Sequence, residues 1–204
     1  MPVSNEIETN EALIVCWDIT ETVKELEAMC RAKSLPIAPE MHLESRRKQV
    51  MVTSLLHHLL FPGTTLNYAA TGKPYVDSPR FVSITHSGDT LTMMRSDHEC
   101  GVDIERVHPR VRKVRHKFLS DAELLVTETA TDEVLTQYWT AKEAMFKVNG
   151  SDRVFMRSNI FVHNLSDKTA SVVLNDEGHE TRRKIRFQMH NDKLLAWTET
   201  CDEK

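Results

Sequence analysis

The order of secondary-structure elements expected from the sequence is the feature that most constrains the fold. A short run of β-branched and aromatic residues at 11–20 is typical of a strand, and apolar residues at helical spacing follow at 21–33 and 39–60. Strand-like runs come next, and the same order of strand, helices and strands begins again near residue 100. Elements grouped in this way indicate an α+β protein, since alternating βαβ units would mix them.

Local signals mark several boundaries. Two alternating runs, 80–87 and 89–96, flank Gly88-Asp89 and predict a hairpin, and residues 100–105 continue as another strand. Pro109 opens a basic helical stretch, and Ser120 with Glu123 has the S-x-x-E form of a capping box. A longer helix is expected at 132–148, ended by Asn149-Gly150, before four closing strand-like runs at 159–164, 169–175, 184–190 and 194–199.

The second predicted helix raises the question of a membrane span. Residues 49–72 contain no Lys, Arg, Asp or Glu, but polar residues and Pro62-Gly63 interrupt them, which favours a buried helix ending near Phe61. The apolar residues taken to repeat along this helix are Leu43, Val50, Leu55 and Leu59.

Composition excludes several classes of protein. The 204 residues permit one large domain or two small ones, and the net charge of −4 excludes a strongly basic nucleic-acid-binding protein. The four cysteines form no C-x-x-C pair, which suits free thiols in a reducing compartment. The acidic N-terminus has no targeting signal, so we expect a cytoplasmic protein.

Asp103 and Glu105 bracket Ile104 on a predicted strand. The period of two sends both carboxylates to one face and Ile104 into the core. Carboxylates so close together are usually solvated, protonated or bound to a cation, and oxygen ligands favour Mg²⁺. Taken alone, the pair also fits an ordinary solvated strand end.

Trp139, Glu143 and Lys147 recur every four residues and would share one side of the 132–148 helix. A plain alternative is a core tryptophan beside a surface Glu143–Lys147 salt bridge. Lys73 in a Gly/Pro turn, and Thr85 with His86 at a strand end, suit phosphate contacts, although ordinary surface turns would look the same.

The combination of motifs is more specific than any one of them. In order they are G-K-P at 72–74, F-V-S-I-T-H-S-G-D at 81–89, G-V-D-I-E at 101–105 and W-T-A-K-E-A-M-F-K at 139–147. Together they resemble the 4′-phosphopantetheinyl transferase superfamily, in its larger type that activates surfactin synthetase. Thr85 stands where the family usually has serine, and V-N-G-S-D-R follows Lys147 where a G-K-G run is common.

The resemblance implies Mg²⁺-dependent transfer of 4′-phosphopantetheine from coenzyme A to a serine hydroxyl of an apo acyl or peptidyl carrier protein, releasing adenosine 3′,5′-bisphosphate. By similarity, the Mg²⁺ ligands are Asp103, Glu105 and Glu143. Glu143, Lys147 and Asp103 are the expected catalytic residues, with Glu143 as the candidate base. The expected coenzyme A contacts are Lys147 at the pyrophosphate and Lys73, Thr85, His86 and an arginine at 46 or 47, with Arg46 preferred.

The resemblance also implies two similar α/β halves, 1–99 and 100–204, packed as a pseudo-dimer with the active site at their interface, in a monomeric chain. Glu123 is a further candidate beside the metal site. The all-cationic segment Arg106–Lys117 follows the metal pair, and either docks an acidic carrier protein or is a solvated helix face. The alternatives to transfer are a non-catalytic coenzyme A or nucleotide-binding protein and a Mg²⁺-dependent phosphohydrolase.

Overall fold

The computed structural model describes residues 3–201. The first part of the chain contains β1 (Val3–Glu8), β2 (Ala12–Asp18), α1 (Val23–Ala32), α2 (Glu44–Leu60), β3 (Leu66–Tyr68), β4 (Pro74–Val76), β5 (Phe81–Ser87) and β6 (Thr90–Ser96). The second part contains β7 (Val102–Arg106), α3 (Arg110–Val114), the 3₁₀-helix η1 (Arg115–Lys117), α4 (Asp121–Val126), α5 (Asp132–Asn149), α6 (Met156–Asn159), β8 (Ile160–His163), β9 (Thr169–Asp176), β10 (His179–His190) and β11 (Lys193–Glu199).

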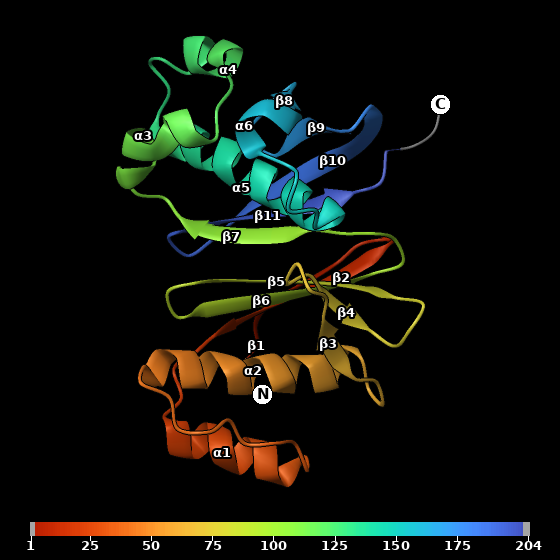
Figure 1. The fold of residues 1–204 in the computed structure, drawn as a ribbon. Coiled ribbons are helices and arrows are strands. Elements are labelled where there is room, and N and C mark those ends of the chain that lie inside the picture. The colour runs from red at the N-terminus through yellow and green to blue at the C-terminus, as the bar shows by residue number, and fades with distance from the viewer. Residues whose placement is uncertain (1–2, 202–204) are drawn as a thin grey trace.

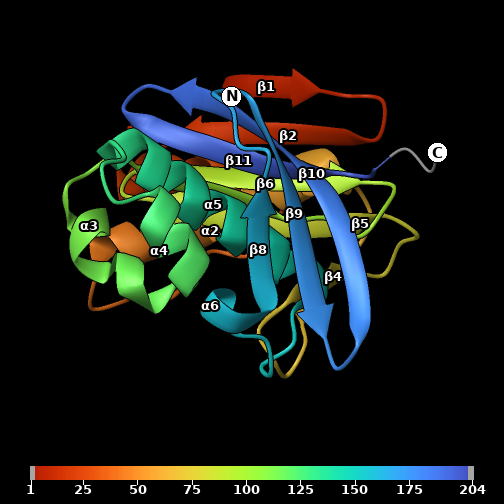
Figure 2. The ribbon, with the colours of Figure 1, turned by 90° about the horizontal axis from the view of Figure 1, so that it is seen from above.

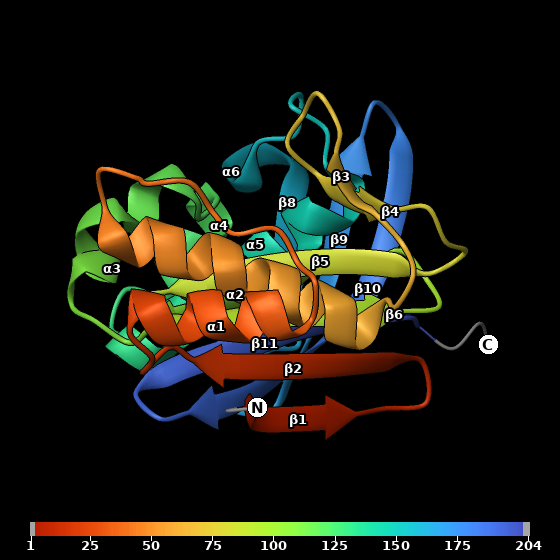
Figure 3. The same cartoon turned by 90° about the horizontal axis from the view of Figure 1, so that it is seen from below.

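Two antiparallel sheets are stacked between helices (Figure 1). The first has the strand order β1-β2-β6-β5; α2 lies against its outer face, and α1 packs against α2 (Figure 3). The second has the order β7-β11-β10-β9-β8, and α5 lies on it with α3 and α4 to one side (Figure 2). The short strands β3 and β4 form a separate hairpin. The prediction of a mixed α+β fold is confirmed.

Three apolar cores hold these layers together. One lies between α1, α2 and the first sheet, and another lies between α5 and the second sheet. The third lies between the two sheets, where β2 and β6 pack against β7 and β11. Ile104 belongs to this third core, as predicted, and burial of apolar surface there opposes separation of the sheets.

The predicted apolar face of α2 is wrong in its phase. The helix begins at Glu44 and not at Pro39, and Leu43, Val50 and Leu59 are exposed, although Leu55 is buried. The buried residues of the helix are Met51, Val52, Leu55, Leu56 and Leu60. Several apolar positions can satisfy a period of 3.6 residues, and the contact with the sheet decides which of them face inward.

The local turn and cap predictions are confirmed. Gly88 adopts a φ of +59° in the two-residue turn between β5 and β6. Ser120 and Glu123 form both hydrogen bonds of the capping box at α4. Gly150, with a φ of +67°, ends α5 in the left-handed conformation.

Three sets of elements were not predicted. The β3–β4 hairpin falls partly in the predicted loop around T-G-K-P, and α6 falls in the segment after Lys147. The edge strand β1 alternates half-buried and exposed positions, but its sequence V-S-N-E-I-E has only two apolar residues and no β-branched run that would predict a strand. Among residues 3–201, no helix has the length and apolar character needed to span a membrane.

Candidate functional site

The strand β7 and the helix α5 can touch because Gly101, the residue just before β7, has no side chain. A Cβ atom at this position would lie 1.8 Å from the backbone oxygen of Ala144. Real Cβ atoms do not approach a carbonyl oxygen so closely, so only glycine fits without a shift of backbone. The approach brings the Glu143–Lys147 turn of α5 next to the carboxylates of β7.

Asp103 and Glu105 lie on the same side of β7 and both face hydroxyl groups of β5. Thr85 Oγ1 donates to Asp103 Oδ1 over 2.9 Å, and Ser87 Oγ donates to Glu105 Oε1 over 3.0 Å. The prediction that the two carboxylates share one face is therefore confirmed. Asp103 is buried, whereas Glu105 is half-buried.

Glu143 lies close enough to Asp103 and Glu105 for their negative charges to affect its protonation. Burial, followed by the charge of Asp103 and to a smaller extent that of Glu105, raises the pKa of Glu143 to about 7 against the opposing effect of Lys147. The Glu143 carboxyl is consequently half protonated near neutral pH.

The donor set fits a hard divalent cation in its chemistry. Within residues 3–201, no three His, Cys, Asp or Glu side chains are arranged as a ready metal site, and Asp103 is directed toward Lys147. All three candidate ligands nevertheless offer carboxylate oxygens, which Mg²⁺ prefers. A cation would also relieve the repulsion that contributes to the raised pKa of Glu143.

Lys147 and Lys73 approach the same place from the two parts of the chain. Lys147 Nζ donates to Asp103 Oδ1 over 2.8 Å and to the Val102 carbonyl over 2.9 Å. The plain alternative of a surface Glu143–Lys147 salt bridge is therefore wrong, because Lys147 forms its ion pair with Asp103. Lys73 donates to the carbonyl of Val148 at the end of α5. Both lysines line a cavity of about 170 Å³, where two cations would attract an anion.

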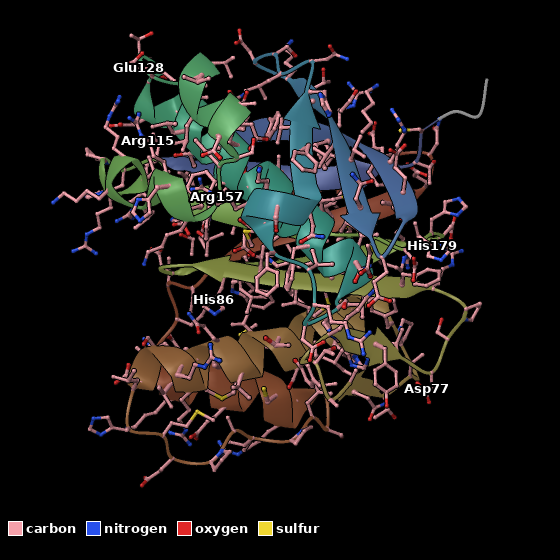
Figure 4. All side chains as sticks on the ribbon, turned by 45° about the horizontal axis from the view of Figure 1, so that its top comes forward. Asp77, His86, Arg115, Glu128, Arg157 and His179 are labelled. Carbon is pink, nitrogen blue, oxygen red and sulfur yellow. The ribbon has the colours of Figure 1, made fainter. Side chains whose placement is uncertain are left out.

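His86 points from β5 toward α2 (Figure 4). Arg46 Nη1 lies 3.1 Å from His86 Nε2, and because guanidinium only donates, this ring nitrogen must accept. Desolvation and the charge of Arg46 lower the pKa of His86, so the ring is neutral at pH 7. Arg47 instead pairs with Glu27 over 2.8 Å, which leaves Arg46 as the arginine beside the site.

A second cavity, of about 570 Å³, opens beside Glu105. The residues that line it include Ser87, Glu105, Trp139 and several members of the Arg106–Lys117 segment. Trp139 packs edge-on against Phe118, with ring centroids 5.1 Å apart. Trp139 is therefore both part of the core around α5 and part of the cavity wall.

The sequence did not predict the buried position of Lys142. This lysine is fully buried, and its ammonium group donates to Glu123 Oε2 over 2.6 Å and to the backbone carbonyls of Phe118, Met156 and Ile160. Glu123 also accepts from the backbone N–H of Val162. Glu123 thus lies with Lys142 in a buried ion pair behind α5. No local sequence pattern predicts the Lys142–Glu123 pair, because its members are 19 residues apart.

These features define a site of three carboxylates and two lysines, built from both parts of the chain. Residues 99–198 match the 4′-phosphopantetheinyl transferase superfamily. This match, which covers just under half of the chain, confirms the resemblance seen in the motifs. The matched stretch contains Asp103, Glu105, Glu143 and Lys147, whereas Lys73, Thr85 and His86 precede it.

Curated relatives carry the same name. The chain is 32% identical over 117 residues to the 4′-phosphopantetheinyl transferase AcpT of Escherichia coli O157:H7, covering 52% of this chain and 58% of the relative. It is 33% identical over 105 residues to AcpT of Salmonella typhi, covering 47% and 55%. It is 31% identical over 83 residues to the 4′-phosphopantetheinyl transferase gsp of Aneurinibacillus migulanus, covering 39% and 35%. The chain thus spans little more than half the length of the AcpT relatives.

Proposed function

We propose that this protein transfers 4′-phosphopantetheine from coenzyme A to a serine hydroxyl of an apo acyl or peptidyl carrier protein, releasing adenosine 3′,5′-bisphosphate. The observation that carries the proposal is the meeting of Asp103 with Lys147 and the electrostatic coupling of Glu143 to Asp103 and Glu105. All four residues fall in the stretch that matches the superfamily.

In this proposal Asp103, Glu105 and Glu143 hold Mg²⁺ together with the coenzyme A pyrophosphate. The cation, when bound, neutralises charge that develops on the pyrophosphate oxygens as the P–O bond breaks. Lys147, beside Asp103 and at the wall of the smaller cavity, contacts the same pyrophosphate.

Glu143 is the proposed general base for the carrier serine. The pKa of Glu143 is raised to about 7 in the protein without metal, and a bound cation would lower it, so the carboxylate would be in the ionised form that accepts a proton. Removal of the hydroxyl proton lets the serine oxygen attack the phosphorus while the leaving nucleotide phosphate departs on the opposite side. Glu143 and Lys147 share one side of α5, so one rigid element orients the base and the phosphate contact.

The nucleotide end of coenzyme A is proposed to contact Arg46, Lys73 and His86, whereas Thr85, which was also expected there, is buried and donates to Asp103. Arg46 and His86 lie side by side, and Lys73 lines the same small cavity as Lys147. A neutral His86 donates one hydrogen bond to a phosphate oxygen without adding charge.

Residues 1–99 and 100–204 are proposed to act as two halves of a pseudo-dimer within one monomeric, cytoplasmic chain. The support is that each part contributes one main sheet with helices on its outer face, and that the candidate residues lie where β5 meets β7. Neither half would be active alone, because each supplies only some of the residues.

The segment Arg106–Lys117 is proposed to dock the carrier protein. It lines the larger cavity next to Glu105, and Lys113 and Lys117 are exposed. Its positive charge would attract the acidic helices that carrier proteins of this class present.

The test is to incubate the purified chain with an apo carrier protein, coenzyme A and Mg²⁺ and to weigh the products by mass spectrometry. Phosphopantetheine on the carrier serine supports transfer, which Glu143→Gln should abolish and Glu133→Gln, an exposed change on the same helix, should not. Nucleotide cleavage alone would point to a hydrolase, and coenzyme A binding without turnover to a non-catalytic protein. Either result would overturn the proposal.

A further inference from the structure

Three hydroxyl residues alternate along β5 and face the second sheet. Ser83, Thr85 and Ser87 are only 3%, 7% and 8% exposed. The two-residue period of a strand places their side chains on one side. β5 is an edge strand of the first sheet, and β7 is an edge strand of the second. The three hydroxyls therefore lie at the junction of two sheet edges.

The three hydroxyls form hydrogen bonds with successive residues of β7. Ser83 Oγ accepts from the Val102 N–H over 3.0 Å, and Thr85 Oγ1 accepts from the Ile104 N–H over 3.4 Å. Such outward amides on an edge strand normally need water or another strand, and here side chains satisfy them. Thr85 also donates to Asp103, and Ser87 donates to Glu105.

The three residues differ in what they bind. Ser83 contacts only backbone in β7, so its hydrogen bond joins the sheets without touching a candidate ligand. Ser87 contacts only a carboxylate oxygen, and Thr85 does both. Ser83 on β5 thus only joins the two sheets, whereas Thr85 and Ser87 on the same strand can orient the carboxylates of Asp103 and Glu105.

We infer that Thr85 and Ser87 are positioning residues that hold the carboxylates of Asp103 and Glu105 in the orientation needed to bind a divalent cation. This inference rests on the proposed function, in which these carboxylates are metal ligands. A hydrogen bond from a buried hydroxyl restricts rotation of the carboxylate and stabilises its charged form. The first part of the chain therefore contributes to the metal site without supplying a ligand.

The geometry gives Thr85 a role that the sequence does not suggest. Its hydroxyl is turned into the junction between β5 and β7, toward Asp103, while the neighbouring His86 points to Arg46. The β-branch of threonine restricts its χ1 angle, which favours a single direction for the hydroxyl. Thr85 and His86 consequently serve opposite faces of β5.

The test compares Mn²⁺ binding by the full-length protein and its variants in the presence of coenzyme A, measured from the free Mn²⁺ signal in electron paramagnetic resonance. Ser87→Ala should weaken binding about tenfold. Ser87→Thr, which keeps the hydroxyl, should restore it. Ser83→Ala is the matched control: it removes a buried hydroxyl from the same strand and should lower the melting temperature while leaving Mn²⁺ affinity unchanged.

The outcomes separate the two proposals. If the wild-type protein binds Mn²⁺ and Ser87→Ala binds it equally well, the positioning role is overturned and the proposed function stands. If Ser83→Ala weakens Mn²⁺ binding as much as Ser87→Ala, the effect is general loosening of the junction, which also overturns the role. If the wild-type protein binds no Mn²⁺ with coenzyme A present, the metal-dependent function fails, and the inference fails with it.

Discussion

Lys147 and Asp103 form an ion pair that joins α5 to β7, with 2.8 Å between Nζ and Oδ1. The same aspartate accepts a hydrogen bond from the Thr85 hydroxyl on β5, so one carboxylate connects β5, β7 and α5. A cation or ligand that binds Asp103 must therefore fit beside both Lys147 and Thr85.

Asp103→Ala should abolish phosphopantetheine transfer, with a loss of about 100-fold or more, because it removes a proposed metal ligand and the partner of Lys147. The chain should remain folded, since Lys147 is 25% exposed and can be solvated. Transfer rates and thermal melts measure both effects. Asp152→Ala, at an exposed residue, is the control. Retained transfer by Asp103→Ala would exclude the assigned role.

Glu143→Gln should change how stability depends on pH. The pKa of Glu143 in the folded protein, about 7, is above its usual value of 4.5, so its neutral form favours folding at low pH and this contribution is lost as pH rises through 7. The variant, which cannot ionise, should be more stable than wild type by roughly 2–3 kcal/mol at pH 8. Urea unfolding at pH 4.5 and pH 8 measures this difference. A constant difference across this range would contradict the shifted pKa.

Lys142→Met should destabilise the fold by about 3–5 kcal/mol, because Glu123 would remain buried without its cation. Lys142→Met combined with Glu123→Gln should recover part of the loss. Recovery should be incomplete, because both carboxylate oxygens of Glu123 accept hydrogen bonds from backbone N–H groups and glutamine has only one accepting oxygen. Free energies of unfolding in urea give the coupling, and strictly additive losses would show that the pair has no special role.

Gly101→Ala should cost about 3 kcal/mol or more in stability, because the added Cβ would meet the backbone of Ala144. The backbone cannot yield as a flexible side chain would. Gly178→Ala is the control, since nothing lies within 4 Å of the added atom and only the φ of +88° opposes the change. Thermal unfolding compares the two variants. Equal losses would mean that the approach of α5 to β7 does not require glycine.

Lys113→Glu with Lys117→Glu should raise the KM for the carrier protein about tenfold and weaken its dependence on salt, while kcat stays the same. Both lysines are exposed members of the basic segment. Arg112 is less suitable because it pairs with Asp132. Lys24→Glu with Lys168→Glu changes the net charge equally at distant exposed sites and should leave KM unchanged. If both double variants respond alike, net charge and not docking explains the effect.

Short-range features were open to prediction because their causes lie within a few residues. The two-residue period of a strand put Asp103 and Glu105 on one side, and the capping box at Ser120 follows from side-chain contacts three residues apart. The Gly88-Asp89 turn follows from the φ angles that such a hairpin requires. The helical spacing of Glu143 and Lys147 likewise follows from the residue sequence alone.

Contacts between distant segments depended on the stacking of the two sheets. The sequence contained Thr85 and Lys142, but only the packed structure directs Thr85 to Asp103 and buries Lys142 against Glu123. The pairing of Lys147 with Asp103, in preference to Glu143 one turn away, depends on the close approach that Gly101 permits. By itself the sequence determined which chemical groups are present and how they are spaced along each element. The tertiary structure decided their partners, because burial removes water and leaves each polar group to bind whatever the neighbouring element presents.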